Sequence, residues 1–145
     1  MIKYTAPAKE EPAVGLSEHT DINYLTILCQ NEVQGLKIIT KEGEWIPVDP
    51  GNDYFVVFVG ESLKAWSNGR LHPPLHQVVF RGLKDRLTCA VFLKPKPGQV
   101  VNTAPEFVSY DHPRLYKPFS YGEFHEYSKT VFTDRVNILK NYAGI

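Results

Sequence analysis

The chain has 145 residues, of which 43% are hydrophobic and 22% charged, a composition typical of one globular domain that can bury a core. Its 16 basic and 16 acidic residues cancel, which argues against nucleic acid or a membrane surface as a partner held by bulk charge. No apolar run approaches the roughly 18 residues of a membrane span, and the N-terminus lacks the apolar segment of a signal peptide. Cys29 and Cys89 lie in apolar runs, so we expect two buried free thiols and a reducing, cytoplasmic setting.

Short β-rich runs separated by turn residues fill the first hundred residues. We expect strands at residues 2–5, 25–29, 75–80 and 86–93, and a loop at 6–12. Two further runs, 35–40 and 44–48, flank Gly43 and predict a hairpin. Residues 54–60 are apolar without a break and predict a strand buried on both faces, whereas 61–66 fits either a strand or a short helix.

The spacing of these runs indicates the fold class. About eight short strands at intervals of about ten residues are typical of a sandwich or barrel such as a double-sheet jelly roll. After Pro105 the pattern changes: Ser120 and Glu123 form a capping box, and apolar residues from Phe124 to Leu139 recur at helical spacing. We therefore expect a mainly β protein with a double-stranded β-helix (jelly-roll) core at 1–105, and a C-terminal helix outside the sheet at 106–145 in the same domain.

Three residues could form a metal centre. His19 and Asp21 would project from one face of a strand, and His76, at the start of a strand, is the best third ligand. Two histidines and one carboxylate form the facial triad of non-haem Fe(II) oxygenases, but they also occur in zinc hydrolases. On these residues alone, a chance grouping of polar side chains in a β-sandwich is a third interpretation. We expect the other histidines to be ordinary loop or surface residues: His72, His112 and His125.

A second group follows ten residues after His76. Arg86 and Thr88 share one face of the strand at 86–93, while Leu87 and Cys89 share the other. An arginine on the inward face is costly unless it is paired, and no acidic residue of that strand can pair with it. A bound carboxylate would match its guanidinium in a bidentate fashion. The alternative is an edge-strand arginine that reaches solvent.

The spacing of both groups resembles the Fe(II)/2-oxoglutarate-dependent dioxygenase family. That family has His-X-Asp, a distal histidine, here fifty-five residues after Asp21, and Arg-X-Ser ten residues beyond it. Two further segments also resemble the family: residues 63–70, which contain Ser-Asn-Gly, and residues 35–48. Segment 112–119 is similar to the plant branch that oxidises specialised metabolites and includes the glucosinolate-modifying dioxygenases. The chain departs from the family pattern at three positions: Thr88 in place of serine, Ile2 in place of asparagine and Gln77 in place of arginine.

The resemblance implies an oxidoreductase and assigns its site residues. Fe(II) would be held by the metal ligands His19, Asp21 and His76. The cosubstrate 2-oxoglutarate would be bound by Arg86, Thr88 and Tyr4. Phe92 matches a position that lines the substrate pocket, with a core phenylalanine as the alternative. The reaction would use O2 and couple decarboxylation of 2-oxoglutarate to succinate with hydroxylation or a related oxidation of a small plant metabolite.

Full-length members of that family carry an N-terminal helical region before the strand that contains Tyr4. We therefore expect this chain to be a fragment or a truncated product, and either a monomer or a protein that lacks that region. The alternative function is a truncated, non-catalytic paralogue that binds metal and 2-oxoglutarate without turnover and exposes an apolar patch. No nucleic-acid or membrane partner is expected.

Overall fold

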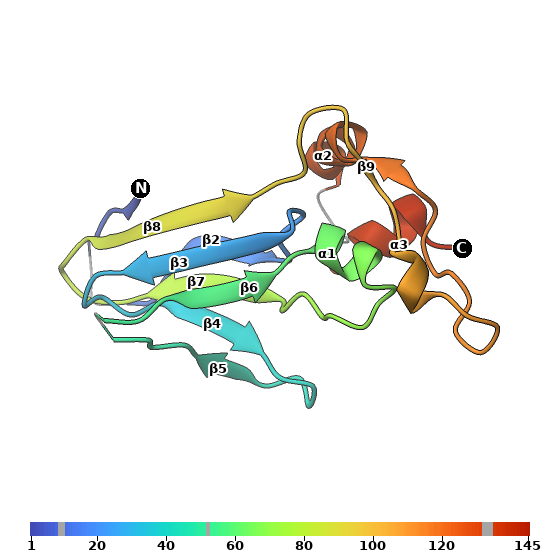
Figure 1. The fold of residues 1–145 in the computed structure, drawn as a ribbon. Coiled ribbons are helices and arrows are strands. Elements are labelled where there is room, and N and C mark those ends of the chain that lie inside the picture. The colour runs from blue at the N-terminus through green and yellow to red at the C-terminus, as the bar shows by residue number, and fades with distance from the viewer. Residues whose placement is uncertain (9–10, 52, 132–134) are drawn as a thin grey trace. The chain divides into compact units, whose positions relative to one another are not determined.

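The computed structural model describes residues 1–8, 11–51, 53–131 and 135–145 (Figure 1). Its helices are α1 (Glu61–Trp66), α2 (Tyr121–Thr130) and α3 (Ile138–Ala143), with a 3-10 turn at Pro105–Phe107. Its strands are β1 (Ile2–Tyr4), β2 (Ala13–His19), β3 (Leu25–Gln30), β4 (Leu36–Ile39), β5 (Trp45–Pro47), β6 (Val56–Val59), β7 (His76–Phe80), β8 (Arg86–Leu93), β9 (Val100–Val101) and β10 (Phe119–Ser120). None of the helices within these ranges is long and apolar enough to cross a membrane.

Two four-stranded sheets carry the predicted mainly β architecture. One has the strand order β1-β8-β3-β6 and the other β2-β7-β4-β5, and β9 pairs with β10 in a small third sheet (Figure 1). Strands that are distant in sequence pair antiparallel, as β1 does with β8 and β2 with β7. The predicted hairpin is confirmed as β4 and β5, with Gly43 at a positive φ of 87° in its turn.

The chain forms two compact units that alternate along the sequence. The first contains Met1–His19, Thr26–Val57 and Pro74–Val91, and the second Thr20–Leu25, Phe58–Pro73 and Phe92–Ile145. The second unit has an apolar core that joins α1, the small sheet and the C-terminal helices. Its buried members are Ala65, Val101, Tyr116, Phe119, Tyr121, Phe124, Ile138, Leu139 and Ala143.

The apolar run at 54–60 is less buried than predicted. It becomes a strand only at Val56, and Val57 is 57% exposed whereas Phe58 is 5% exposed. Successive side chains of a strand point to opposite faces, and in β6 only the face that carries Phe58 is covered.

The cysteines are free thiols, as predicted, but their predicted burial is wrong. Cys29 is half-buried and Cys89 is exposed. Cys89 shares the outer face of β8 with Leu87, Val91 and Leu93, which are also exposed. The apolar run that suggested a buried cysteine therefore follows a strand with only one buried face.

The predicted C-terminal helix is α2. The Ser120 hydroxyl accepts a hydrogen bond from the backbone N–H of Glu123, which confirms the predicted cap. Ile138 and Leu139, which the helical spacing assigned to the same helix, lie in the separate helix α3. Residues 132–134 of the predicted helix, and residues 9–10 of the predicted loop at 6–12, lie outside the described ranges.

Asp85 links the turn before β8 to β1, and this link should depend on pH. Its carboxylate lies 2.7 Å from Lys3 Nζ and accepts a hydrogen bond from the Ala6 N–H at 2.8 Å, and both contacts hold the pKa of Asp85 below its usual range. The stabilisation is therefore present above the usual aspartate pKa and is lost as the pH falls through the lowered, folded-state pKa. We expect Asp85→Asn to reduce the hydrogen-exchange protection of the β1 amides at neutral pH, by a small factor because the pair is exposed.

Glu32→Gln is the matched control, because it breaks the exposed Glu32–Lys84 pair and touches no residue of β1. The difference between Asp85→Asn and the parent should shrink as the pH falls below about 4. Equal protection of β1 in both variants at neutral pH would contradict the role given to Asp85.

Candidate metal centre and carboxylate site

His19 and His76 meet as a cross-strand pair at the ends of β2 and β7. They are register partners, and their ring centroids lie 4.3 Å apart. His76 shares the buried face of β7 with Val78 and Phe80. The sheet therefore brings together two imidazoles that are far apart in the sequence.

Two irregularities in β2 create this pairing. Ala13 pairs with Phe80 and Val14 with Val79, but register shifts then occur on both sides of Leu16. Each shift inserts one extra residue in β2, so His19 reaches His76 and not Pro74, which a regular ladder would place opposite it. Such bulges re-aim side chains, and here they bring the two histidines opposite each other across the strand pair.

The backbone fixes the orientation of both rings. Nδ1 of His19 lies 2.8 Å from the carbonyl oxygen of Ser17, and Nδ1 of His76 lies 3.1 Å from that of Pro74. A carbonyl can only accept, so each Nδ1 carries the proton, and each Nε2 keeps the lone pair that a metal requires. Both histidine rings are thus held by a hydrogen bond to the backbone carbonyl of the residue two positions earlier in the chain.

Asp21 completes the group, although it does not lie on the strand as predicted. β2 ends at His19, and Asp21 belongs to the irregular segment 20–24. Each residue of the group nevertheless offers one ligand atom, and the three atoms lie within 4.8 Å of one another: one each from His19, Asp21 and His76. The predicted two-histidine, one-carboxylate set therefore converges, and it suits a divalent metal that accepts both nitrogen and oxygen ligands.

Arg86 is fully buried, which rules out the solvent-exposed alternative. Its Nη2 donates a hydrogen bond of 2.7 Å to Oε1 of Gln30, whereas Nε and Nη1 have no hydrogen-bond partner among the described residues. The neighbouring Thr88 is 2% exposed, and its hydroxyl is likewise unpartnered within those residues. Burial lowers the pKa of the guanidinium, but an arginine keeps its charge.

Tyr4 and Gly35 pack close to this cation. The Arg86 guanidinium carbon lies 5.2 Å from the centroid of the Tyr4 ring. A Cβ placed on Gly35 would come within 2.9 Å of the Phe80 Cβ and 3.1 Å of the Arg86 Cδ, so only glycine leaves room for the side chain. Phe92, the predicted substrate contact, is 44% exposed on β8.

The unpartnered donors match the acceptors of a carboxylate. Two guanidinium N–H groups and one hydroxyl, all buried, can donate to the two oxygens of one carboxylate group. Leaving such groups unsatisfied costs about 1–3 kcal/mol each, and more for a charged group. The residues present therefore fit one end of a dicarboxylate.

Sequence reasoning missed three residues that border these sites. Gln30 orients Arg86, and Glu61 is 1% exposed with a pKa raised by burial. Tyr121 has a buried hydroxyl, and its pKa is raised by burial and by the negative charge of Asp21. None of the three had a distinctive signal in the sequence: Glu61 could begin either a strand or a helix, and an acidic residue in a first helical turn is common on a surface.

A family model for the 2OG-Fe(II) oxygenase superfamily matches residues 1–95, which include all the convergent residues described above. The chain belongs to this oxygenase superfamily. The predicted resemblance is thereby confirmed, and with it the class of metal and cosubstrate that the family name states.

Curated and solved relatives agree with this assignment. The chain is 43% identical over 134 residues to a probable 2-oxoglutarate-dependent dioxygenase AOP1 of Arabidopsis thaliana, covering 90% of this chain and 44% of that protein. The rice dioxygenase for auxin oxidation superposes with a TM-score of 0.90 at 33% identity, covering 98% of this chain and 49% of the other. JOX2, solved in complex with 2OG, Fe and JA, superposes with a TM-score of 0.88 at 27% identity. The match covers 99% of this chain and 42% of JOX2. The chain thus spans less than half the length of these relatives.

Replacement of Gly35 should disturb the carboxylate site of this oxygenase. Gly35→Ala places a methyl group against Phe80 and Arg86, so we expect a loss of about 1–3 kcal/mol in the free energy of unfolding, as for other overpacked sites, together with weaker 2-oxoglutarate binding. Chemical denaturation and calorimetry measure the two effects.

Gly122→Ala is the matched control. A Cβ there meets only the Ser120 Oγ at 3.7 Å, and alanine favours the helix α2, so stability should hold or rise slightly. If Gly35→Ala were as stable as Gly122→Ala, the close packing of Arg86 against Gly35 would be refuted.

Proposed function

We propose that this chain is the iron- and 2-oxoglutarate-binding core of a dioxygenase that oxidises a small plant metabolite. The observation that carries the proposal is the buried Arg86 with two unpartnered nitrogens, in a chain whose His19, Asp21 and His76 converge. A zinc hydrolase would need the three ligands but not Arg86 and Thr88. A non-catalytic paralogue would bind metal and 2-oxoglutarate through the same residues, so only turnover separates the two functions. It is not favoured, because the chain is similar to proteins named as dioxygenases.

The two histidines and Asp21 would hold the metal. Their Nδ1 atoms are bonded to backbone carbonyls, which leaves Nε2 of each ring to bind the metal, and Asp21 adds a carboxylate oxygen. Bound Fe(II) and 2-oxoglutarate supply the oxidising chemistry, in which O2 is consumed, 2-oxoglutarate becomes succinate and the metabolite is hydroxylated or otherwise oxidised.

The carboxylate donors would hold the cosubstrate. Gln30 fixes one nitrogen of the Arg86 guanidinium and leaves the other two to bind the distal carboxylate of 2-oxoglutarate, with the Thr88 hydroxyl as a third donor. Because Arg86 is inaccessible to water, its charge is poorly screened and attracts an anion strongly. Tyr4 packs near the cation and would complete the cosubstrate site.

Further features of the protein are part of the same proposal. We infer that residues 1–105 form the oxygenase core and residues 106–145 a helical extension of the same domain. Phe92 would contact the substrate. We also infer a monomeric cytoplasmic protein: the free thiols fit a reducing compartment, and the balanced charge argues against a nucleic-acid or membrane partner held by bulk charge.

Loss of Arg86 should remove cosubstrate binding while sparing the metal. We expect Arg86→Ala in the 145-residue chain to weaken 2-oxoglutarate binding at least about 100-fold, since it removes two charge-assisted hydrogen bonds. Arg86→Lys should recover part of the affinity, because lysine keeps the charge but not the planar fork. Anaerobic calorimetry with Fe(II) measures binding, and succinate formation in air measures turnover.

Arg81→Ala is the control, because Arg81 is an exposed arginine close to the same strand. It should bind 2-oxoglutarate like the parent. The proposal fails if the parent binds no 2-oxoglutarate in the presence of Fe(II), or if Arg86→Ala binds it as tightly as Arg81→Ala does.

A further inference from the structure

The sheet does not hold the third metal ligand. His19 and His76 lie on paired strands, but Asp21 lies in the segment 20–24, beyond the end of β2. Asp21 is therefore held in place by contacts other than the β-ladder.

Helix α1 supplies these contacts through its first backbone amides. The Glu61 N–H donates to the carbonyl of Asp21 at 2.8 Å, and the Gly60 N–H donates to the carbonyl of Tyr24 at 2.9 Å. The Ser62 hydroxyl donates to the carbonyl of Ile22 at 2.5 Å. The start of the helix thus binds the backbone of the segment that carries Asp21.

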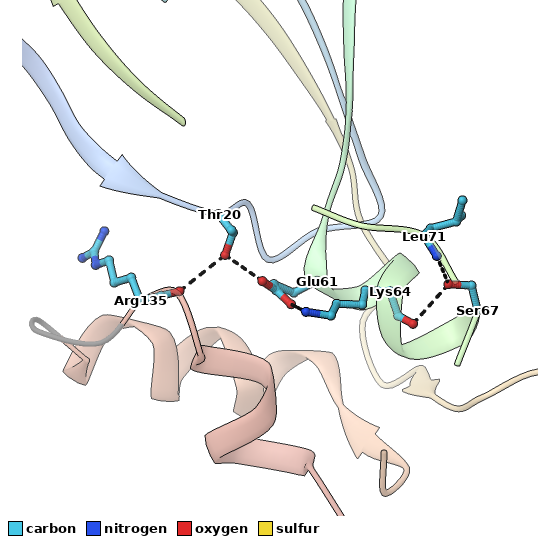
Figure 2. A network of polar contacts seen from close by, with 6 residues as sticks. All are labelled: Thr20, Glu61, Lys64, Ser67, Leu71 and Arg135. Carbon is cyan, nitrogen blue, oxygen red and sulfur yellow. Dashed lines mark hydrogen bonds and ion pairs between the residues drawn. The ribbon is translucent and has the colours of Figure 1, made fainter. Parts of the chain in front are cut away.

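Glu61 adds a second hold through its side chain. Its Oε1 accepts a hydrogen bond of 2.8 Å from the hydroxyl of Thr20, the residue between the two ligands, as Figure 2 shows. Thr20 is 9% exposed and Glu61 1% exposed, so water does not compete for this bond. Lys64 Nζ lies 3.9 Å from the other carboxylate oxygen and balances the buried charge. A longer contact of 3.4 Å joins the Thr20 hydroxyl to the Arg135 carbonyl.

We propose that Glu61 is a positioning residue for the metal centre. It binds Thr20 through its carboxylate and Asp21 through its backbone N–H, and thereby keeps the Asp21 carboxylate directed toward the two histidines. Its side chain acts through the Thr20 hydroxyl and does not touch the metal. This inference rests on the proposed metal centre and goes beyond it, because it assigns a role to a carboxylate outside the ligand set.

The test measures the affinity of the metal-free 145-residue chain for Co(II) alone, by titration of the ligand-field absorption, together with thermal unfolding of the metal-free protein. Thr20→Val removes the hydroxyl at nearly constant volume. We expect it to lower the Co(II) affinity about tenfold, as substitutions of other residues that orient metal ligands do, and to alter the absorption spectrum of the bound Co(II). Glu61→Leu should cause a similar loss. Glu61→Gln keeps an oxygen that accepts from Thr20, so it should bind Co(II) nearly as the parent does.

Thr103→Val is the matched control. Thr103 is a buried threonine that donates to the Ala65 carbonyl at 3.0 Å and makes no hydrogen bond to Thr20, Asp21 or Glu61. It should lower the unfolding temperature but leave Co(II) affinity unchanged. The inference is overturned if Thr20→Val binds Co(II) as tightly as Thr103→Val, or if Glu61→Gln loses as much affinity as Glu61→Leu. If the parent itself bound no Co(II), the metal centre would be refuted and this inference with it.

Discussion

A buried, incompletely paired cation is the constraint on which the rest of this oxygenase depends. Arg86 is inaccessible to solvent, yet Gln30 satisfies only one of its nitrogens among the described residues. Without a ligand the protein bears the cost of these open donors, and a bound carboxylate would remove that cost. Gly35 allows the Arg86 side chain to pack closely and Tyr4 gives the guanidinium an aromatic neighbour, but neither neutralises it.

The three proposed metal ligands are held by two different kinds of structure. A β-ladder places the two histidines, and backbone carbonyls set their rings. Asp21 depends instead on tertiary hydrogen bonds to the start of α1. The first arrangement is as rigid as the sheet, whereas the second can open when a short irregular segment moves. The geometry of the third ligand is therefore the part of the site most sensitive to substitutions away from the ligands themselves.

The sequence predicted features that follow from local periodicity and spacing. Alternation along 86–93 assigned Arg86 and Thr88 to one buried face, and turn residues located the hairpin around Gly43. It could not predict the two bulges in β2, because a register shift depends on the partner strand. It also overestimated the burial of 54–60, because an apolar run does not reveal whether other elements cover both faces of its strand.

The C-terminal residues bear on the metal centre through the same helix that positions Asp21. Ala65 of α1 is 1% exposed in a core shared with Phe124 of α2 and Leu139 of α3. This core fixes the helix whose first residues bind the segment 20–24. The family match ends at residue 95, yet the support for one ligand extends to the end of the chain. The packing of α1, and with it the contacts of Glu61 to Thr20 and Asp21, therefore depends on residues beyond the family match.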